Sequence, residues 1–247
     1  MRIILSPAKQ MREDSDTFNV TTPQLLDKTH IILDRLKSMS YEELKAMWNC
    51  NEKIAKENYE RLKYIDFKTN LSPAVLAYDG IAFKYMSPAV FTDSEYEYIN
   101  NNLYILSGFY GALRPMDAVQ PYRLEMQSKL SVNNKNSLYE FWGESIYNTV
   151  RDNDGIFINL ASKEYSKCIE TYLKKDDIFI TCVFAQNVGG KLVQKATLAK
   201  MARGEAVRFL AENNASSPDV LKGFNRLGFE FSEELSTKTK YVFILEA

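Results

Sequence analysis

The stretch IFINLASKEYSKCIETYLKKDDIFITCVF, residues 156–184, contains the alternation from which we predict the fold class. Apolar, β-branched and aromatic residues dominate positions 156–160 and 178–184, which is typical of strands. Ser162 can cap a helix that runs from there to Leu173. A strand, a helix and a second strand therefore follow one another within this single stretch.

Further strands and helices are predicted on both sides of it. Strand-like segments are residues 2–5, 103–106, 191–193 and 241–245, and helical spacing recurs over residues 137–150 and 197–213. Residues 187–190, Asn-Val-Gly-Gly, can turn one strand into the next, and residues 229–231 can pair with the last strand. We predict an α/β (mixed α+β) fold with a mixed β-sheet flanked by helices. Because no repeat or Gly/Ser/Pro-rich linker divides the chain, we expect residues 1–247 to form a single domain.

Three helices are predicted in the first quarter of the chain. Thr22 can cap a first helix with Pro23 in its first turn, and apolar residues continue at helical spacing to about Lys37. Ser40 and Glu43 form a capping box that opens a second helix, and a third covers residues 54–62. Together the second and third helices make a helix-hairpin-helix-like element near residues 40–64.

Composition excludes several classes of protein. The chain is 45% hydrophobic and 26% charged, as globular domains are, and its longest apolar runs are far shorter than the roughly 20 residues that cross a bilayer. The first residues do not form a signal peptide, so we expect a soluble cytoplasmic protein without a membrane partner. The net charge of −1 leaves nucleic-acid binding to a local patch rather than a global field.

Thiol, histidine and metal chemistry are also disfavoured. The 3 cysteines form no CxxC pair, and the single histidine, His30, lies in a helical stretch. No EF-hand, HExxH or ExxH spacing is present, so we expect no cofactor and no metal site. Carboxylate sites for iron or magnesium remain an open alternative, since 32 acidic residues are available.

The hairpin between the second and third helices is the first candidate site. Its spacing matches a helix-hairpin-helix DNA-binding turn, with Asn49 and Asn51 where glycines usually stand. Asparagine tolerates the left-handed conformation, and Asn51 can also cap the following helix. Backbone N–H groups there, beside Lys53, can hold a DNA phosphate without reading sequence. Two core helices joined by a tight turn would explain the same residues.

A basic helix over residues 197–213 is the second candidate. Lys200, Arg203 and Arg208 lie on the face opposite its apolar residues. Gly204 inside this helix costs about 1 kcal/mol against alanine, so either a phosphate or another protein segment is expected to approach the backbone there. A solvated charged face is the alternative.

Polar clusters that follow apolar segments supply the cleft candidates. Residues 107–126 combine glycines, prolines, arginines, acids and tyrosines in one loop-rich stretch, without a GxGxxG pattern. This stretch is either part of a site or an ordered loop locked by arginine–carboxylate pairs. With residues 6–9, 78–84 and 159–165, it can converge on one anion-binding or acid/base cleft. The cleft candidates are Ser6, Lys9, Asp79, Lys84, Arg114, Tyr122, Arg123, Glu125 and Ser162.

These segments resemble the YaaA family of bacterial peroxide-stress proteins. The matching stretches are SPAK at residues 6–9, YDG at 78–80, LSGFYGALRP at 106–115, PYRLEM at 121–126, NLASKEY at 159–165 and ARG at 202–204. They occur in this order along nearly the whole chain, and residues 106–126 are the most specific part.

The resemblance implies a cytosolic protein that limits peroxide damage, is associated with lower free intracellular iron, and binds DNA through a basic cleft and a helix-hairpin-helix element. We therefore predict DNA, duplex or branched and not sequence-specific, as the partner, with no obligate protein partner. The DNA-binding residues would be Asn49, Asn51, Lys53, Lys200, Arg203 and Arg208. The alternative is an enzyme acting on a small anionic or nucleotide-like substrate in the Lys/Arg/Asp-lined cleft. An iron-buffering protein that uses carboxylates is a third possibility, and no catalytic residue is assigned.

Overall fold

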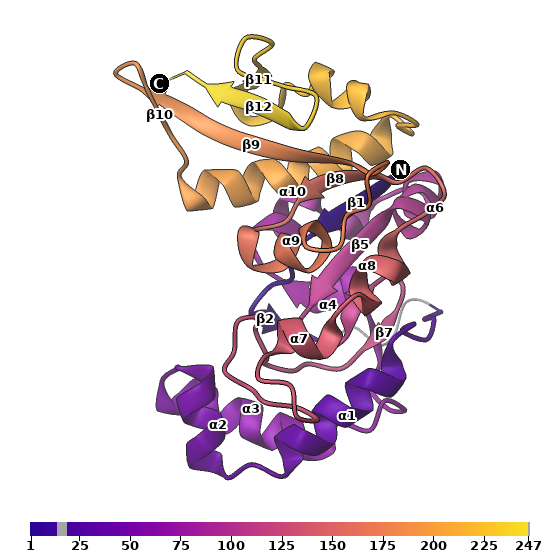
Figure 1. The fold of residues 1–247 in the computed structure, drawn as a ribbon, viewed down its shortest axis with the longest axis vertical. Coiled ribbons are helices and arrows are strands. Elements are labelled where there is room, and N and C mark those ends of the chain that lie inside the picture. Colours follow the sequence, from indigo (N-terminus) through magenta and orange to yellow (C-terminus); the bar gives the residue numbers. More distant parts are fainter. Residues whose placement is uncertain (14–18, 247) are drawn as a thin grey trace.

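The structure is a computed structural model that describes residues 1–13 and 19–246, and its centre is an eight-stranded mixed sheet (Figure 1). The strand order is β11-β12-β9-β8-β1-β5-β6, and β10 pairs with β9 outside this path. The strands are β1 (Arg2–Leu5), β5 (Leu103–Ser107), β6 (Gly111–Leu113), β8 (Ile156–Leu160), β9 (Ile178–Val188), β10 (Lys191–Val193), β11 (Phe229–Phe231) and β12 (Lys240–Leu245). The predicted mixed sheet flanked by helices is confirmed.

The five central strands β5, β1, β8, β9 and β12 are parallel, and β6, β10 and β11 pair antiparallel at the margins. From β1 the chain builds the sheet outward through β5 and β6, then returns to the other side of β1 and continues through β8, β9 and β12. The order therefore reverses between β1 and β8. Open α/β sheets bind ligands at such a reversal, beyond the carboxyl ends of the strands.

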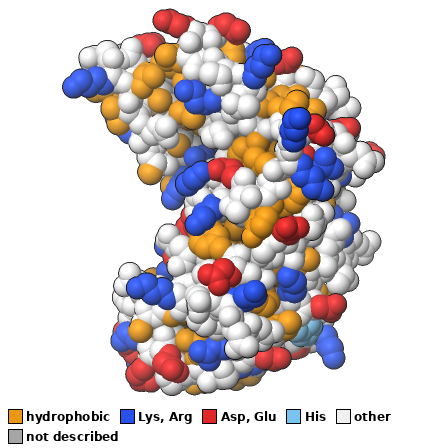
Figure 2. Space-filling view, viewed as in Figure 1, with side chains coloured by type: hydrophobic (Ala, Val, Ile, Leu, Met, Phe, Trp, Pro, Cys, Tyr) orange, Lys and Arg blue, Asp and Glu red, His pale blue; other side chains and the backbone are white. Residues whose placement is uncertain are grey.

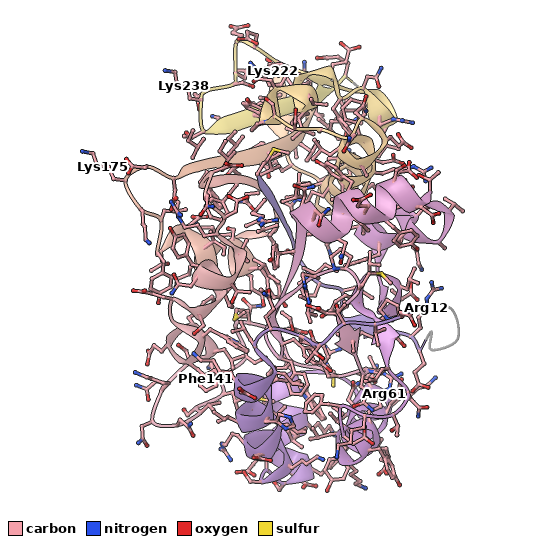
Figure 3. All side chains as sticks on the ribbon, turned by 90° about the vertical axis from the view of Figure 1, so that its right-hand side faces the viewer. Arg12, Arg61, Phe141, Lys175, Lys222 and Lys238 are labelled. Carbon is pink, nitrogen blue, oxygen red and sulfur yellow. The ribbon has the colours of Figure 1, made fainter. Side chains whose placement is uncertain are left out.

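Helices cover both faces of the sheet. One layer contains α5 (Ile81–Met86), α6 (Asp93–Asn102) and α10 (Ala196–Glu212), which pack on one another. The other contains α7 (Leu138–Trp142), α8 (Ser145–Val150) and α9 (Lys163–Glu170). Figure 3, turned by 90°, shows these two groups on opposite sides of the central strands. Parallel strands buried on both faces explain the continuous apolar runs of β1, β5 and β8.

A lobe of three helices extends beyond the sheet. It consists of α1 (Leu26–Lys37), α2 (Tyr41–Trp48) and α3 (Glu52–Tyr64), at the bottom of Figure 1. Arg61 of α3 lies in this lobe in Figure 3, whereas Lys222 and Lys238 lie at the opposite end of the molecule. Two short ladders join the lobe side to the sheet side: β2 (Gln10–Met11) with β4 (Tyr78–Asp79), and β3 (Ser72–Pro73) with β7 (Ala118–Val119). The remaining short helices are α4 (Ala74–Ala77), η1 (Pro88–Val90), η2 (Pro218–Gly223) and η3 (Arg226–Gly228).

Local signals placed seven strands of the main sheet and several helices, whereas α5 and α6 were not predicted from the sequence. The capping box of α2 is present: Ser40 Oγ accepts the N–H of Glu43 at 3.2 Å, and Glu43 Oε2 accepts the N–H of Ser40 at 2.8 Å. The β9–β10 connection turns at Gly189 and Gly190, whose φ angles are 58° and 79°. The pairing of β11 with β12 is also as predicted.

Three helix predictions were wrong in their bounds, among them the helix expected to run from Ser162 to Leu173, which is α9 and ends at Glu170. The first helix begins at Leu26 rather than after Thr22, because Thr21 is held in an extended bridge with Asp117, where its carbonyl accepts the N–H of Ala118 at 2.7 Å. The single helix expected over residues 137–150 is two helices, because Gly143 takes a φ of 49° and a ψ of −134° between them. In the part of the chain that the structure describes, no helix is both long and apolar enough to span a membrane.

Candidate functional site

A cleft of about 400 Å³ opens at the carboxyl ends of β1 and β8, the two strands that flank the reversal of strand order. Leu5 and Leu160, the last residues of these strands, line it. The four segments predicted to converge all reach it. It gathers the predicted residues Ser6, Lys9, Asp79, Tyr122, Arg123, Glu125 and Ser162, together with Lys200 and Arg203 of α10. We call this the switch-point cleft.

The cleft lies on a concave side of the molecule. Figure 2 shows the surface hollowed on the left between the α1–α3 lobe and the part that carries β9 and α10. Lysine and arginine side chains gather beside this hollow in the same view. The β2, α9 and α10 elements that contribute to the cleft border it in Figure 1.

A serine pair ties the two strand ends together. Ser6 Oγ accepts the N–H of Ser162 at 2.8 Å and donates to Ser162 Oγ at 3.2 Å. Ser162 is the N-cap residue of α9, but its hydroxyl caps no N–H of that helix. Its own proton has no acceptor among the described residues, so Ser162 can donate a hydrogen bond into the cleft.

A buried tyrosine cluster sets the position of Arg123 and Glu125. The Tyr122 hydroxyl lies 2.6 Å from Ser107 Oγ at the end of β5 and 2.8 Å from the Tyr78 hydroxyl next to Asp79. Gly108 allows residues 124–126 to pass close by, since a Cβ there would lie 2.7 Å from the Leu124 carbonyl oxygen. The family-like stretch 107–126 is therefore a packed loop whose far end delivers charged side chains to the cleft.

Cations and carboxylates alternate along one wall. Glu125 Oε1 lies 2.9 Å from Lys9 Nζ and 3.2 Å from Arg123 Nη2, so one carboxylate is shared by two cations. Glu164 is less well compensated: burial and the nearby charge of Glu125 raise its pKa, while the backbone N–H of Gln127 and the charge of Lys9 act against them. Two neighbouring carboxylates in unlike surroundings are a common basis for acid/base chemistry.

Arg203 enters the cleft from α10 and forms no ion pair with any residue that the structure describes. Its Nε is fully buried and makes no hydrogen bond with any described residue, and burial lowers the pKa of its guanidinium. The next residue, Gly204, explains the placement: a Cβ there would lie 2.0 Å from the Ala82 carbonyl oxygen of α5. The close approach expected at Gly204 is therefore made by another protein segment, and it holds Arg203 at the cleft.

Besides the three hairpin residues, three predicted residues lie outside the cleft lining. Arg114 follows β6 near the other edge of the sheet, where its Nη2 lies 3.0 Å from the buried Asp117 Oδ1. Lys84 Nζ lies 3.1 Å from Asp79 Oδ1, so it borders the cleft through that carboxylate. Arg208 Nε is 2.7 Å from Glu212 Oε1 on the same helix.

The hairpin has the local geometry that its sequence predicts. Asn49 ends α2 in the left-handed conformation with a φ of 44°, and the Asn51 side chain accepts the N–H of Ile54 at 2.9 Å as the N-cap of α3. Lys53 is exposed and forms no ion pair with any described residue, whereas Glu52 is paired with Lys45 and Lys56. The turn can present backbone N–H groups to an anion, and Lys53 is the cation beside it.

Two of the three cysteines, Cys168 and Cys182, are buried. Burial raises the pKa of both Cys168 and Cys182 to about 12, so both remain neutral thiols near pH 7. Residues 1–13 and 19–246 contain no group of three or more His, Cys, Asp or Glu side chains placed to hold a metal ion.

Sequence reasoning missed Glu164 as a site residue. It lies in the NLASKEY stretch that was singled out, two positions after Ser162 and in the first turn of α9. A carboxylate one turn into a helix that follows a strand at the reversal point was the available signal. What the sequence could not show was that Glu125, far away in the chain, lies near it.

Fold and cleft together define an open α/β protein with a charged cleft at the reversal point of its sheet. A family model described as peroxide stress protein YaaA matches residues 1–235. The chain belongs to this family, as its sequence motifs predicted.

Relatives cover the chain almost from end to end. A UPF0246 protein of Agathobacter rectalis is 55% identical over 244 residues, 98% of each chain. Those of Lachnoclostridium phytofermentans and Ligilactobacillus salivarius are 50% and 49% identical over 245 residues, which is 99% of this chain and 96% and 99% of theirs.

Proposed function

We propose that this protein acts in the peroxide response by binding DNA through its phosphate backbone, and so helps to limit free intracellular iron and oxidative damage. The observation that carries the proposal is the α2–α3 turn. Asn49 adopts the left-handed conformation that a glycine would otherwise supply, and Asn51 caps α3 as the motif requires. The exposed Lys53 and the concave basic side beside the cleft support the same reading.

Charge balance argues for modest affinity. In the α2–α3 hairpin the cations Lys45 and Lys56 are already paired with Glu52, so Lys53 is the cation at the turn that pairs with no described residue. Binding that depends on few phosphate contacts should weaken as salt rises, with a slope of about one per contact. DNA shape rather than base sequence would then decide the preference.

The direct test is fluorescence anisotropy with duplex, single-stranded and four-way-junction DNA across a salt series. Lys53→Glu should weaken binding and lower the salt slope by about one. Lys238→Glu is the matched control, since Lys238 is exposed at the far end of the molecule and forms no ion pair with a described residue. Equal affinities of wild type and Lys53→Glu would contradict the hairpin as the contact.

The cellular part has its own test. A strain that lacks the gene should contain more free iron and survive peroxide less well, and the wild-type gene should restore both. If Lys53→Glu protein restores them equally well, DNA binding through the turn is not how the protein protects the cell.

A second candidate is an enzyme acting on a small anionic or nucleotide-like substrate. The raised pKa of Glu164, beside a Glu125 that is paired with Lys9 and Arg123, favours it, because a carboxyl whose pKa is raised by burial is suited to donate a proton. Glu164→Gln would remove turnover and leave substrate binding in place, whereas a DNA-binding protein without catalysis would show no turnover to lose.

A further inference from the structure

We propose that the switch-point cleft binds the phosphate of a mononucleotide, either free or as one unit of a nucleic-acid strand, through the guanidinium of Arg203. The inference rests on the proposed function in taking this cleft as a binding site, but it does not require the α2–α3 hairpin to bind DNA. It assigns a ligand class to the cleft and a role to one half-buried arginine.

The first step is the missing partner of Arg203. Arg203 is half-buried, and a guanidinium N–H group taken out of water is unfavourable unless an anion or another acceptor meets it. No described carboxylate lies within 4.0 Å of Arg203, and its buried Nε has no hydrogen-bond acceptor. Arg203 keeps its charge at neutral pH, so the folded chain holds a positive charge that an anionic ligand would neutralise.

The second step is the distribution of the other charges. Lys9 and Arg123 both pair with Glu125, and Lys84 forms an ion pair with Asp79. Lys200 lies one helical turn before Arg203 on α10, is exposed and pairs with no described residue. The α10 side of the cleft therefore carries two uncompensated cations, while the opposite wall is balanced.

The third step is the set of hydrogen-bond donors. Arg203 offers a planar fork of N–H groups, which matches phosphate oxygens in pairs. The Ser162 hydroxyl, whose proton is not used by any described residue, is a further hydrogen-bond donor at the strand ends. These groups come from α10 and from the β8–α9 connection, and both are fixed by backbone contacts rather than by long flexible loops.

The fourth step is size and the remaining chemistry. A cleft of about 400 Å³ is far larger than a lone phosphate needs and falls in the range of small-ligand sites. Apolar residues such as Leu5, Ala8 and Leu124 line it beside the charged wall, and Glu164 can accept hydrogen bonds from hydroxyl or amino groups. A nucleotide combines a phosphate, a flat ring and several donors, which is the combination that this cleft complements.

The test is isothermal titration calorimetry of the whole protein with dAMP, with deoxyadenosine and with inorganic phosphate. We expect saturable dAMP binding below about 1 mM, and at least about tenfold weaker binding of deoxyadenosine, which lacks the phosphate. Arg203→Gln should weaken the binding of dAMP by at least about tenfold. Arg226→Gln is the control and should leave affinity within about twofold, since Arg226 is exposed outside the cleft and pairs with Glu212.

Folding is checked separately by thermal melting. If Arg203→Gln does not fold, the Lys200→Gln variant is tested in its place. Because Lys200 is exposed, its loss should weaken dAMP binding by about threefold without disturbing the packing of the protein. No saturable binding of dAMP or phosphate by wild type would overturn the proposal. So would a folded Arg203→Gln protein with unchanged dAMP affinity.

Two DNA probes distinguish the sources of the nucleotide. If the ligand is part of a strand, a duplex with one unpaired nucleotide should bind more tightly than a fully paired duplex, and Arg203→Gln should remove the difference. If the ligand is free, dAMP binds and the two duplexes bind alike. A protein that binds dAMP but no DNA would contradict the proposed DNA-binding function alone, and one that binds paired duplex but not dAMP would contradict this inference alone.

Discussion

Gly204 of α10 and Ala82 of α5 are in direct backbone contact: a Cβ on Gly204 would lie 2.0 Å from the Ala82 carbonyl oxygen and 3.0 Å from the Met86 nitrogen. Both atoms belong to a helix backbone, which cannot move aside as a flexible side chain can. This contact brings α10 and α5 together at the edge of the cleft, where Ala82 and Arg203 both contribute to its lining.

Gly204→Ala should therefore destabilise the fold, although alanine is the better helix former. We expect a loss of about 1–3 kcal/mol or more from overpacking, seen as a fall in Tm of about 2–12 °C for a chain of this size. Gly223→Ala is the control, because its added Cβ would meet only Phe209 at 3.9 Å. Equal melting temperatures for Gly204→Ala and wild type would show that the two helices can separate without cost.

Arg114→Met should lower stability and leave cleft binding unchanged. Arg114 lies 3.0 Å from Asp117, which is fully buried and whose pKa is raised by that burial. Removing the cation leaves an uncompensated buried carboxylate. We expect the free energy of unfolding to fall by about 1–3 kcal/mol, which is less than for a fully buried pair because Arg114 is 30% exposed. Urea unfolding measures the loss, and dAMP titration at a temperature where the variant is folded checks the second half. Loss of ligand affinity in folded protein would place Arg114 in the site after all.

Glu164→Gln should change how stability depends on pH. The folded-state pKa of Glu164 is raised above its ordinary value of 4.5, so the folded chain binds this proton more tightly than the unfolded chain. Its stabilising contribution is present below pH 4.5 and is lost as pH rises through the raised pKa. As pH rises from 4.5 through the raised pKa of Glu164, the Tm of wild type should therefore fall relative to the Tm of Glu164→Gln. Glu97→Gln, an exposed change on α6, should give a flat difference.

Asn51→Asp should separate DNA binding from helix capping. Aspartate can still accept the N–H of Ile54 and is favourable at a helix start, so Tm should stay near that of wild type. The added negative charge would face the phosphate, and we expect about 1 kcal/mol, or about fivefold, weaker DNA binding at low salt. Asn51→Ser keeps the cap without the charge and should bind as wild type does. Unchanged affinity of Asn51→Asp would remove the α3 start from the interface.

Hydrogen peroxide should leave Cys168 and Cys182 reduced in the native protein. Both side chains are buried and their pKa values are raised to about 12, so almost no thiolate is present to attack peroxide. Mass spectrometry after peroxide treatment measures the oxidation, and the same treatment in urea should expose both thiols and serves as the control. Rapid sulfenic acid formation at either native cysteine would indicate a thiol-based peroxide sensor.

Much of the secondary structure followed from local sequence. The capping box of α2, the cap of α3 and the Gly-Gly turn between β9 and β10 are decided within a few residues, because each depends on one side chain and its nearest backbone. The start of the first helix was predicted wrongly, since Asp117, which is distant in the chain, holds Thr21 in an extended conformation. Local propensity cannot anticipate a partner that arrives from elsewhere.

The candidate site divides in the same way. The amino-acid sequence by itself determined the mixed α/β class, the family and the polar stretches after apolar segments, because periodicity, capping and motif order are written along the chain. Only the tertiary structure decided which of those residues meet: it joined Ser6 to Ser162, placed Arg203 in the cleft without a partner among the described residues, and paired Arg114 with Asp117 outside the cleft. Strand order is the physical reason, since β1 and β8 are neighbours in the sheet although about 150 residues of chain lie between them, and their carboxyl ends must therefore build one cleft.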